Sequence, residues 1–307
     1  MIDITQNPVS TATPKVRFSP RRVWTLAMAT VTQLIRMKIL AFLVLFCLLA
    51  AGAGFAFSVI NPEQQLNLLK SVTLGALQIF SIVIGVVSTA LLLPKDLEDR
   101  TLYTILSKPV PRFDYLLGKL LGVLLLIGGG LIVMDVVLSL VLWLRQTMLL
   151  DSYVASLRLE NMDSPEALAQ VREIVAKQGL TWNLHWAVWA IFLKAAVVTT
   201  VALLLSSIAS STLFTIVITF CVTIIGHGES LIREFFFRPY LSSLAGRSAA
   251  FVLAALCPDL AQFDIVDSVV NGETVPWGAI YDMTGIAALY MTVYLFVTHL
   301  LFVEKEL

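Results

Sequence analysis

The strongest constraint on the fold is a series of long apolar stretches along the chain. A helix that crosses the hydrocarbon layer of a bilayer, about 30 Å thick, needs about 20 consecutive apolar residues. The stretches that meet or approach this length are residues 39–60, 72–93, 116–144, 186–208, 212–226 and 279–303. We therefore predict an all-α polytopic membrane protein with six transmembrane helices within a single domain, residues 19–307.

The composition excludes the main alternatives to this fold class. Hydrophobic residues make up 58% of the chain and charged residues 14%, against roughly 25% charged residues in a soluble domain. Basic and acidic residues balance at 21 each, so there is no basic excess to favour a nucleic-acid partner. A cleaved signal peptide is the alternative interpretation of residues 39–60, but the 38 residues before them are too many for its charged region.

The distribution of basic residues predicts the orientation in the membrane. Lysine and arginine are concentrated in the segments before residue 39, between residues 93 and 116, and after residue 303. Such segments face the cytoplasm by the positive-inside rule, so both termini are expected there. Tryptophans favour membrane interfaces, and five lie near the predicted outer one: Trp143, Trp182, Trp186, Trp189 and Trp277.

The segments outside the predicted spans have their own signals. Residues 1–18 are polar and are expected to be a disordered tail, whereas residues 19–37 have the apolar periodicity of an amphipathic helix in the inner interface. A cytosolic extension of the first span is the alternative interpretation of 19–37. Residues 145–185 are expected to form an external insertion, with a helix that begins at Ser164-Pro165-Glu166 and ends at Gly179.

Residues 227–278 combine charged side chains with short apolar runs, so they fit neither a lipid-exposed span nor a solvated loop. Irregular backbone at membrane depth is tolerated where protein buries it. We predict a pair of short re-entrant helices on the outer side, then a surface helix near 263–270. Gly272 then permits a turn, and Pro276-Trp277 marks the entry to the last span.

Sequence signatures of catalysis are absent. The chain contains no P-loop, no zinc-protease H-E-x-x-H and no G-x-S-x-G, and its three histidines are dispersed. The cysteines Cys47, Cys221 and Cys257 lack the spacing of a zinc site or a disulfide framework. We therefore expect no catalytic residue, no metal site and no enzyme activity in this chain.

Two charged residues, Asp135 and Lys194, lie inside the third and fourth apolar stretches. Asp135 is eight residues before Trp143, and Lys194 is eight residues after Trp186, so both are expected about 12 Å below the outer interface. Because charges inside a membrane are costly and usually paired, we predict an ion pair between them that fixes helix register. The alternative is that each side chain reaches water separately.

The segment between the second and third stretches has an organisation of its own. Acidic residues gather where a helix could begin, at Asp96, Glu98 and Asp99, and the helix dipole favours negative charge there. Apolar residues follow, and Pro109 and Pro111 end the helix. On these grounds alone the segment is either an interfacial connector or a short rigid helix that transmits force to a cytosolic partner.

A family resemblance favours the second interpretation. Asp99-Arg100-Thr101-Leu102, then Ser107-Lys108-Pro109-Val110-Pro111-Arg112 and Leu116-Leu117-Gly118-Lys119, resemble the loop after the second span in exporter-type permeases of ATP-binding cassette (ABC) transporters, the ABC-2 superfamily. The segment from Cys257-Pro258-Asp259-Leu260 to Val275-Pro276-Trp277 resembles the approach to the last span in the same family. The resemblance covers nearly the whole chain.

The resemblance implies a two-part machine. Two permease chains, as a homodimer or a related heterodimer, form the transmembrane unit, and ABC ATP-binding subunits that hold ATP and Mg²⁺ dock below, so this chain binds no cofactor. Residues 95–107 would be the coupling helix. The residues assigned to ATPase coupling are Asp96, Glu98, Asp99, Arg100, Thr101, Leu102 and Ile105. The expected location is the bacterial inner membrane, in contact with lipids.

Two other classes of function stay open at this stage. One is an intramembrane enzyme that acts on a lipid-linked substrate, which would need clustered polar residues at one depth. The other is a membrane scaffold that binds an ATPase but moves nothing. The transported substrate is not legible in the sequence, and an external insertion of this length is more than the family leads us to expect.

Overall fold

The computed structural model describes residues 18–36, 62–98, 111–161, 164–209, 211–237 and 257–304, together with the single positions 45 and 52. Four helices in these ranges are long and apolar enough to cross a membrane, which indicates a membrane protein. They are α3 (Pro62–Glu98), α5 (Arg112–Leu159), α7 (Asn183–Ile208) and α11 (Trp277–Glu304). The described ranges contain no β-strand. The predicted span at 39–60 lies outside them except for two isolated positions.

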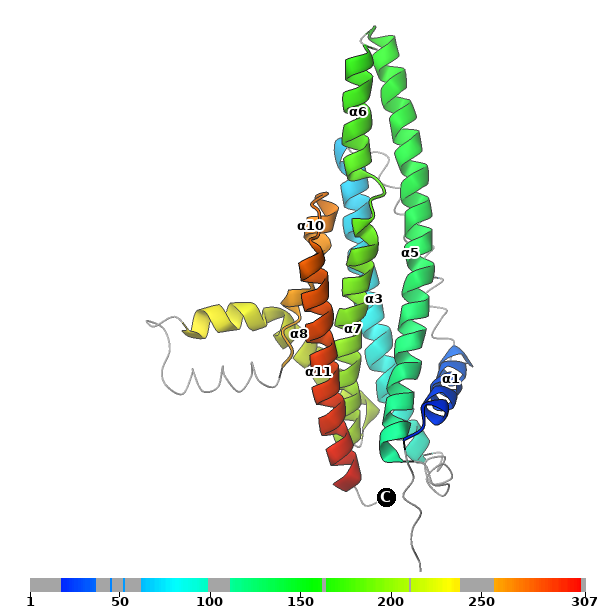
Figure 1. Ribbon diagram of the computed structural model, residues 1–307, viewed down its shortest axis with the longest axis vertical. Helices are drawn as coiled ribbons and strands as arrows, with labels where there is room; N and C mark the ends of the chain where they lie inside the picture. Colours follow the sequence, from blue (N-terminus) through cyan, green and yellow to red (C-terminus); the bar gives the residue numbers. More distant parts are fainter. Residues whose placement is uncertain are drawn as a thin grey trace, which may run out of the picture.

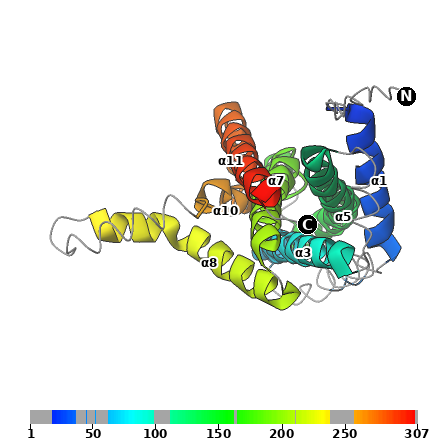
Figure 2. The same ribbon diagram turned by 90° about the horizontal axis from the view of Figure 1, so that it is seen from below.

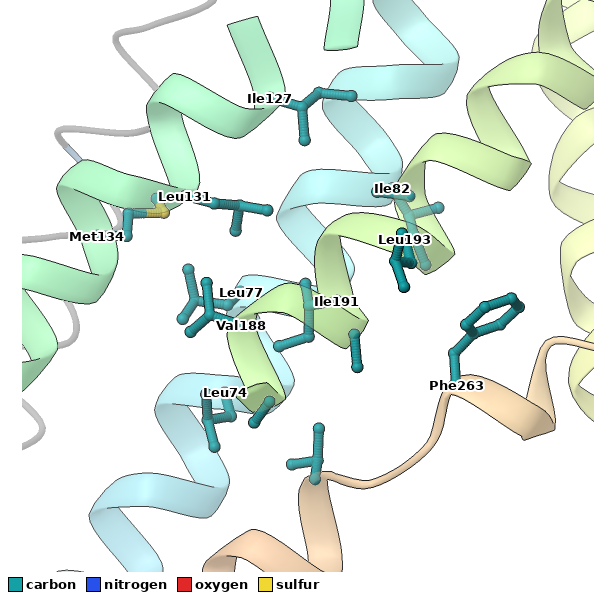
Figure 3. Packing of buried hydrophobic residues seen from close by; sticks show 14 of the residues in the cluster. Leu74, Leu77, Ile82, Ile127, Leu131, Met134, Val188, Ile191, Leu193 and Phe263 are labelled. Carbon is teal, nitrogen blue, oxygen red and sulfur yellow. The ribbon is translucent and has the colours of Figure 1, made fainter. Parts of the chain in front are cut away.

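Helix α7 is the centre of the bundle, with α3, α5 and α11 packed around it (Figures 1 and 2). Alanines and β-branched residues dominate its sequence, and most of its side chains are buried. The core joins leucine, isoleucine and methionine side chains of α3, α5 and α7 (Figure 3). Phe263 closes the core from a short 3₁₀ helix, η2 (Ala261–Phe263).

Helix α1 (Pro20–Arg36) lies across the bundle axis, against the first part of α5 (Figures 1 and 2). Its buried face consists of Val23, Ala27, Thr30 and Leu34, as the apolar periodicity predicts. Trp24, Met28 and Ile35 are exposed on another face of the same helix. Exposed apolar side chains on a helix that lies across a bundle suit a membrane interface, which favours the interfacial interpretation of this segment.

The predicted external insertion is a helical hairpin. Helix α5 does not end at Arg145 but continues to Leu159, and α6 (Pro165–Gln178) returns alongside it (Figure 1). Leu149 of α5 and Val175 of α6 are buried in the same hydrophobic cluster, and this packing keeps the helix continuous. The predicted ends of α6 are confirmed: the Ser164 hydroxyl accepts a hydrogen bond from the amide of Ala167, and Gly179 is the C-cap.

Helix α3 is longer than the predicted second span, residues 72–93. Helix α3 begins ten residues before Val72 and continues through Pro94 to Glu98. Proline lacks an amide hydrogen and usually ends a helix, but a long membrane helix tolerates it where neighbouring groups satisfy the freed carbonyl. Asp96 and Glu98 therefore lie in the last turn of α3, not at the start of a separate helix.

The region after the fourth span differs from its prediction in part. Helix α8 (Thr212–Phe237) begins where predicted but continues past Gly226, so the first predicted re-entrant helix is the end of α8, which projects sideways from the bundle (Figure 1). The second lies outside the described residues. A short helix, α10 (Val266–Val270), lies where the surface helix is predicted, but three of its five residues are buried, and Gly272 adopts a positive φ of 79° in the turn that follows.

Candidate functional site

One end of the bundle, where α1, the start of α5 and the end of α11 meet, is held together by buried polar contacts. We call it the inner end, after the orientation that the sequence predicts. The carboxylate of Asp114 is 1% exposed and accepts hydrogen bonds from Nε and Nη2 of Arg22, at 3.2 and 3.1 Å, and from the amide of Ser19. Both guanidinium nitrogens face the same oxygen, Oδ2, and charge-assisted contacts of this kind are stronger than those between neutral groups. Asp114 therefore ties the start of α1 to the first turn of α5.

A second set of contacts ties α5 to the end of α11. Nη1 of Arg112 donates to the carbonyl oxygens of Phe302 and Val303 at 2.9 and 2.8 Å. The last carbonyls of a helix have no partner within the helix, and a cation beside them also complements the helix dipole. The ring of Tyr115 stacks on that of Phe302, with centroids 6.2 Å apart. The start of α5 is thus joined to both α1 and α11.

Two glycines of α5 let α1 approach closely. A Cβ atom at Gly118 would lie 2.6 Å from the Cβ of Leu26, and one at Gly122 would lie 2.8 Å from the carbonyl oxygen of Ala27. The spacing is that of the small-x-x-x-small pattern, which brings helix backbones together in membranes. The pattern Gly118-x-x-x-Gly122 is legible in the sequence, but the sequence analysis did not assign it a partner.

The predicted coupling residues belong to this inner end only in part. Asp96 and Glu98 lie in the last turn of α3, and Asp99, Arg100, Thr101, Leu102 and Ile105 lie outside the described residues. Helix α3 ends at Glu98 and helix α5 begins at Arg112. Both points lie at the end of the bundle that also carries α1 and the end of α11 (Figures 1 and 2).

The predicted ion pair between Asp135 and Lys194 does not form. Oδ2 of Asp135 instead accepts a hydrogen bond from Nδ1 of His185 at 2.7 Å. Nζ of Lys194, whose side chain is 1% exposed, lies 3.3 Å from Nε2 of His227 and 3.8 Å from a carboxylate oxygen of Asp264. Each predicted partner thus belongs to a different polar cluster.

The geometry of α7 explains why the pairing failed. His185 and Lys194 are nine residues apart, which at 3.6 residues per turn places them on opposite sides of the helix and about 13 Å apart along its axis. The distance of each charge from a tryptophan predicts its depth in the membrane, but it does not predict the side of the helix on which the charge lies. Because α5 continues beyond Trp143, that residue is also a poor marker of the interface.

Lys70 is a buried charge that the sequence prediction did not include. Lys70 of α3 is 1% exposed, and its Nζ has no hydrogen-bond partner among the described residues. It lies four residues after Leu66 and four before Leu74, both buried, so all three share one face of the helix. The spacing of four residues between Leu66, Lys70 and Leu74 is a sequence signal that Lys70 faces the bundle. It applies only if the helix begins before residue 72, which the sequence analysis did not predict.

An apolar groove of about 500 Å³ runs between α5 and α7. Apolar side chains and two glycines make up most of its wall, and Asp135 and His185 add polar groups. The complete lining consists of Leu121, Leu124, Leu125, Gly128, Gly129, Leu131, Ile132, Asp135, His185, Val188, Trp189 and Phe192. From Leu121 to Asp135 the wall formed by α5 extends about 21 Å. The groove can hold an elongated apolar molecule with a polar group at one end.

The described residues contain no cluster of three or more histidine, cysteine, aspartate or glutamate side chains that could hold a metal ion. No protein-family model and no curated protein matches this chain.

Proposed function

We propose that this chain is the membrane-spanning permease subunit of an ATP-driven exporter, with the ATPase in a separate subunit. The carrying observation is the inner end of the bundle. The segment 99–110 begins and ends there, beside an α1 that is docked through Gly118 and Gly122 and held by Asp114. Because α3 ends and α5 begins at this end of the bundle, next to the fixed crossing helix α1, a partner that binds there can pass on force to these helices.

The length of α5 supports the same role. This helix has 48 residues, about 72 Å, and runs from the inner end to the external hairpin. Arg112 and Asp114 in its first turn join it to α11 and α1. A movement of these helices at the inner end would therefore displace the whole of α5. The proposal includes six spans, with 39–60 and 212–226 added to the four long helices, and both termini in the cytoplasm of a bacterial inner membrane.

The proposed complex contains a second permease chain and ATP-binding subunits that carry ATP and Mg²⁺. The absence of a P-loop from this chain accords with that division of labour. The groove between α5 and α7 and the exposed apolar face of α1 offer contact surfaces for membrane lipid. A nucleic-acid partner has no support in the balanced charge.

Substitution of Glu98 or Leu102 tests the coupling role. In the complex purified from native membranes, Glu98→Lys or Leu102→Trp should separate ATP hydrolysis from transport, while the amount of inserted chain stays unchanged. The matched control is Glu166→Lys, an equivalent charge reversal in the external helix α6. Normal ATP-dependent transport by both inner variants would contradict the assignment of this segment.

A further inference from the structure

We propose that the groove between α5 and α7 binds a cationic amphiphile, with a primary ammonium group at Asp135 and an apolar chain along Gly128, Gly129 and Leu125. The proposal concerns binding to this chain alone and is independent of a role in transport. It starts from the lining of the groove, in which Asp135 is the acidic residue.

The carboxylate of Asp135 is oriented but has bonding capacity left. Nδ1 of His185 occupies Oδ2, while Oδ1 has no hydrogen-bond partner among the described residues. A buried carboxylate oxygen without a donor is unfavourable, by about 1–3 kcal/mol. The side chain as a whole keeps 18% of its surface exposed and lines the groove, whereas Oδ1 itself is covered. A ligand with N–H donors therefore meets the exposed part of the carboxyl group first and reaches Oδ1 after a local shift of the side chain.

The charge of the site selects the sign of the ligand. Asp135 is the acidic side chain of the lining, and an ionised carboxylate can only accept hydrogen bonds, so it accepts N–H donors such as Nδ1–H of His185 and a ligand ammonium group. The ring of Trp189 lines the groove one helical turn from His185 and is held by its Nε1–H bond to the Thr284 hydroxyl at 3.2 Å. An aromatic ring in the wall also favours a cation over an anion.

The two glycines give the groove its depth. A Cβ atom at Gly128 would meet the ring of Phe192 at 3.3 Å, whereas one at Gly129 would meet no atom within 4 Å. A side chain at position 129 would therefore extend into the groove without disturbing the packing of α5. This allows the cavity to be filled while Asp135 and His185 stay as they are.

The test uses the full chain in phosphatidylcholine nanodiscs and n-dodecylamine that carries a photoreactive diazirine on its alkyl chain. Crosslinks are mapped by mass spectrometry to residues 121–135 and 185–192. We expect saturable labelling there. Unlabelled n-dodecylamine should compete at least about tenfold better than n-dodecanol or dodecyl sulfate, because only the amine offers a charged N–H donor to the carboxylate.

Two variants with matched controls complete the test. Asp135→Asn should weaken labelling about tenfold, and Gly129→Leu should abolish it by filling the groove. Asp282→Asn and Gly285→Leu, which alter exposed positions on α11 outside the groove, should label as the wild type. Equal competition by the alcohol and the sulfate, or wild-type labelling of both groove variants, would overturn the proposal and leave a plain lipid-facing surface. Elution volume and thermal unfolding of each variant verify its fold.

Discussion

Replacement of Gly122 by alanine is the sharpest test of how α1 is attached to the bundle. The added Cβ would lie 2.5 Å from the Cβ of Thr30 and 2.8 Å from the carbonyl oxygen of Ala27. The carbonyl oxygen belongs to the backbone of α1, so no side-chain rotation can relieve the clash. The whole helix has to move away from α5.

The size of the effect follows from these distances. Carbon atoms in contact are normally separated by about 3.5–4.0 Å, so α1 has to retreat by about 1 Å, which forfeits a quarter to a half of the dispersion energy at the interface. Overpacking of this kind typically costs about 1–3 kcal/mol. We expect the docking equilibrium of α1 to fall by a factor of roughly 5 to 150.

A cysteine at Val23 reports the docking. Val23 is 4% exposed in the α1–α5 interface, and Val23→Cys is studied in a background without Cys47, Cys221 and Cys257. The rate at which a maleimide labels this cysteine in membranes measures how often α1 leaves its site. Gly122→Ala should raise the rate by the same factor of roughly 5 to 150, since each 1.4 kcal/mol is tenfold in an equilibrium.

Gly129→Ala is the matched control. It lies on the same helix and gains the same helix propensity, but its new Cβ meets no atom within 4 Å. The control should label at the wild-type rate. Equal labelling of the two alanine variants would refute the close packing of α1 on Gly122.

Two further predictions concern the outer half of the molecule. Asp135→His should lower the yield of folded protein and reduce its free energy of unfolding by about 1–3 kcal/mol, and the added change His185→Asp should restore both. The double variant Asp135→Lys with Lys194→Asp should restore neither. Thermal unfolding followed by size-exclusion chromatography measures the effect, and rescue by the lysine exchange would contradict the pairing in the structure. Ser164→Ala removes the N-cap of α6 and should destabilise the hairpin of α5 and α6 by about 1 kcal/mol. The loss should appear as faster limited proteolysis near residue 164. Ser156→Ala on α5 is the control, because Ser156 does not cap the start of a helix.

The sequence predicts most accurately those features that local chemistry determines. Ser164 and Gly179 limit α6 as their capping preferences indicate, and Gly272 adopts the positive φ that glycine permits. The start of α8 at Thr212 and the end of α7 at Ile208 also agree with the pattern. Each of these signals acts over a few residues and needs no knowledge of the neighbours.

The sequence predicts less well where a helix outlasts its apolar stretch. Residues after Arg145 are more polar than the apolar stretch before them, and packing against α6 keeps them helical. Hydropathy measures the length of a span, not the length of a helix. The same reason explains why α3 begins before residue 72 and why Lys70 was not recognised as a buried charge.

The polar clusters depend on helix rotation, which only tertiary packing fixes. The predicted pair of Asp135 and Lys194 rests on their equal depth in the membrane. In the structure Asp135 pairs with His185 and Lys194 with Asp264, because the rotation of α5 and α7 about their axes determines which side chains face each other. The inner contacts of Asp114 and Arg112 join residues far apart in sequence. No local sequence pattern specifies such partners. The spacing of Gly118 and Gly122 in α5 does, however, indicate a close contact with another helix.

The central claim is that the segment after α3 engages an ATP-hydrolysing subunit from the cytoplasm. The most direct measurement places a photoreactive amino acid at position 102 of the full chain and irradiates native membranes, with the same probe at position 166 as the external control. The account predicts a covalent product with an ATP-binding subunit from position 102 and none from position 166. No such product from position 102, or labelling of position 102 by a membrane-impermeant reagent added outside, would contradict it.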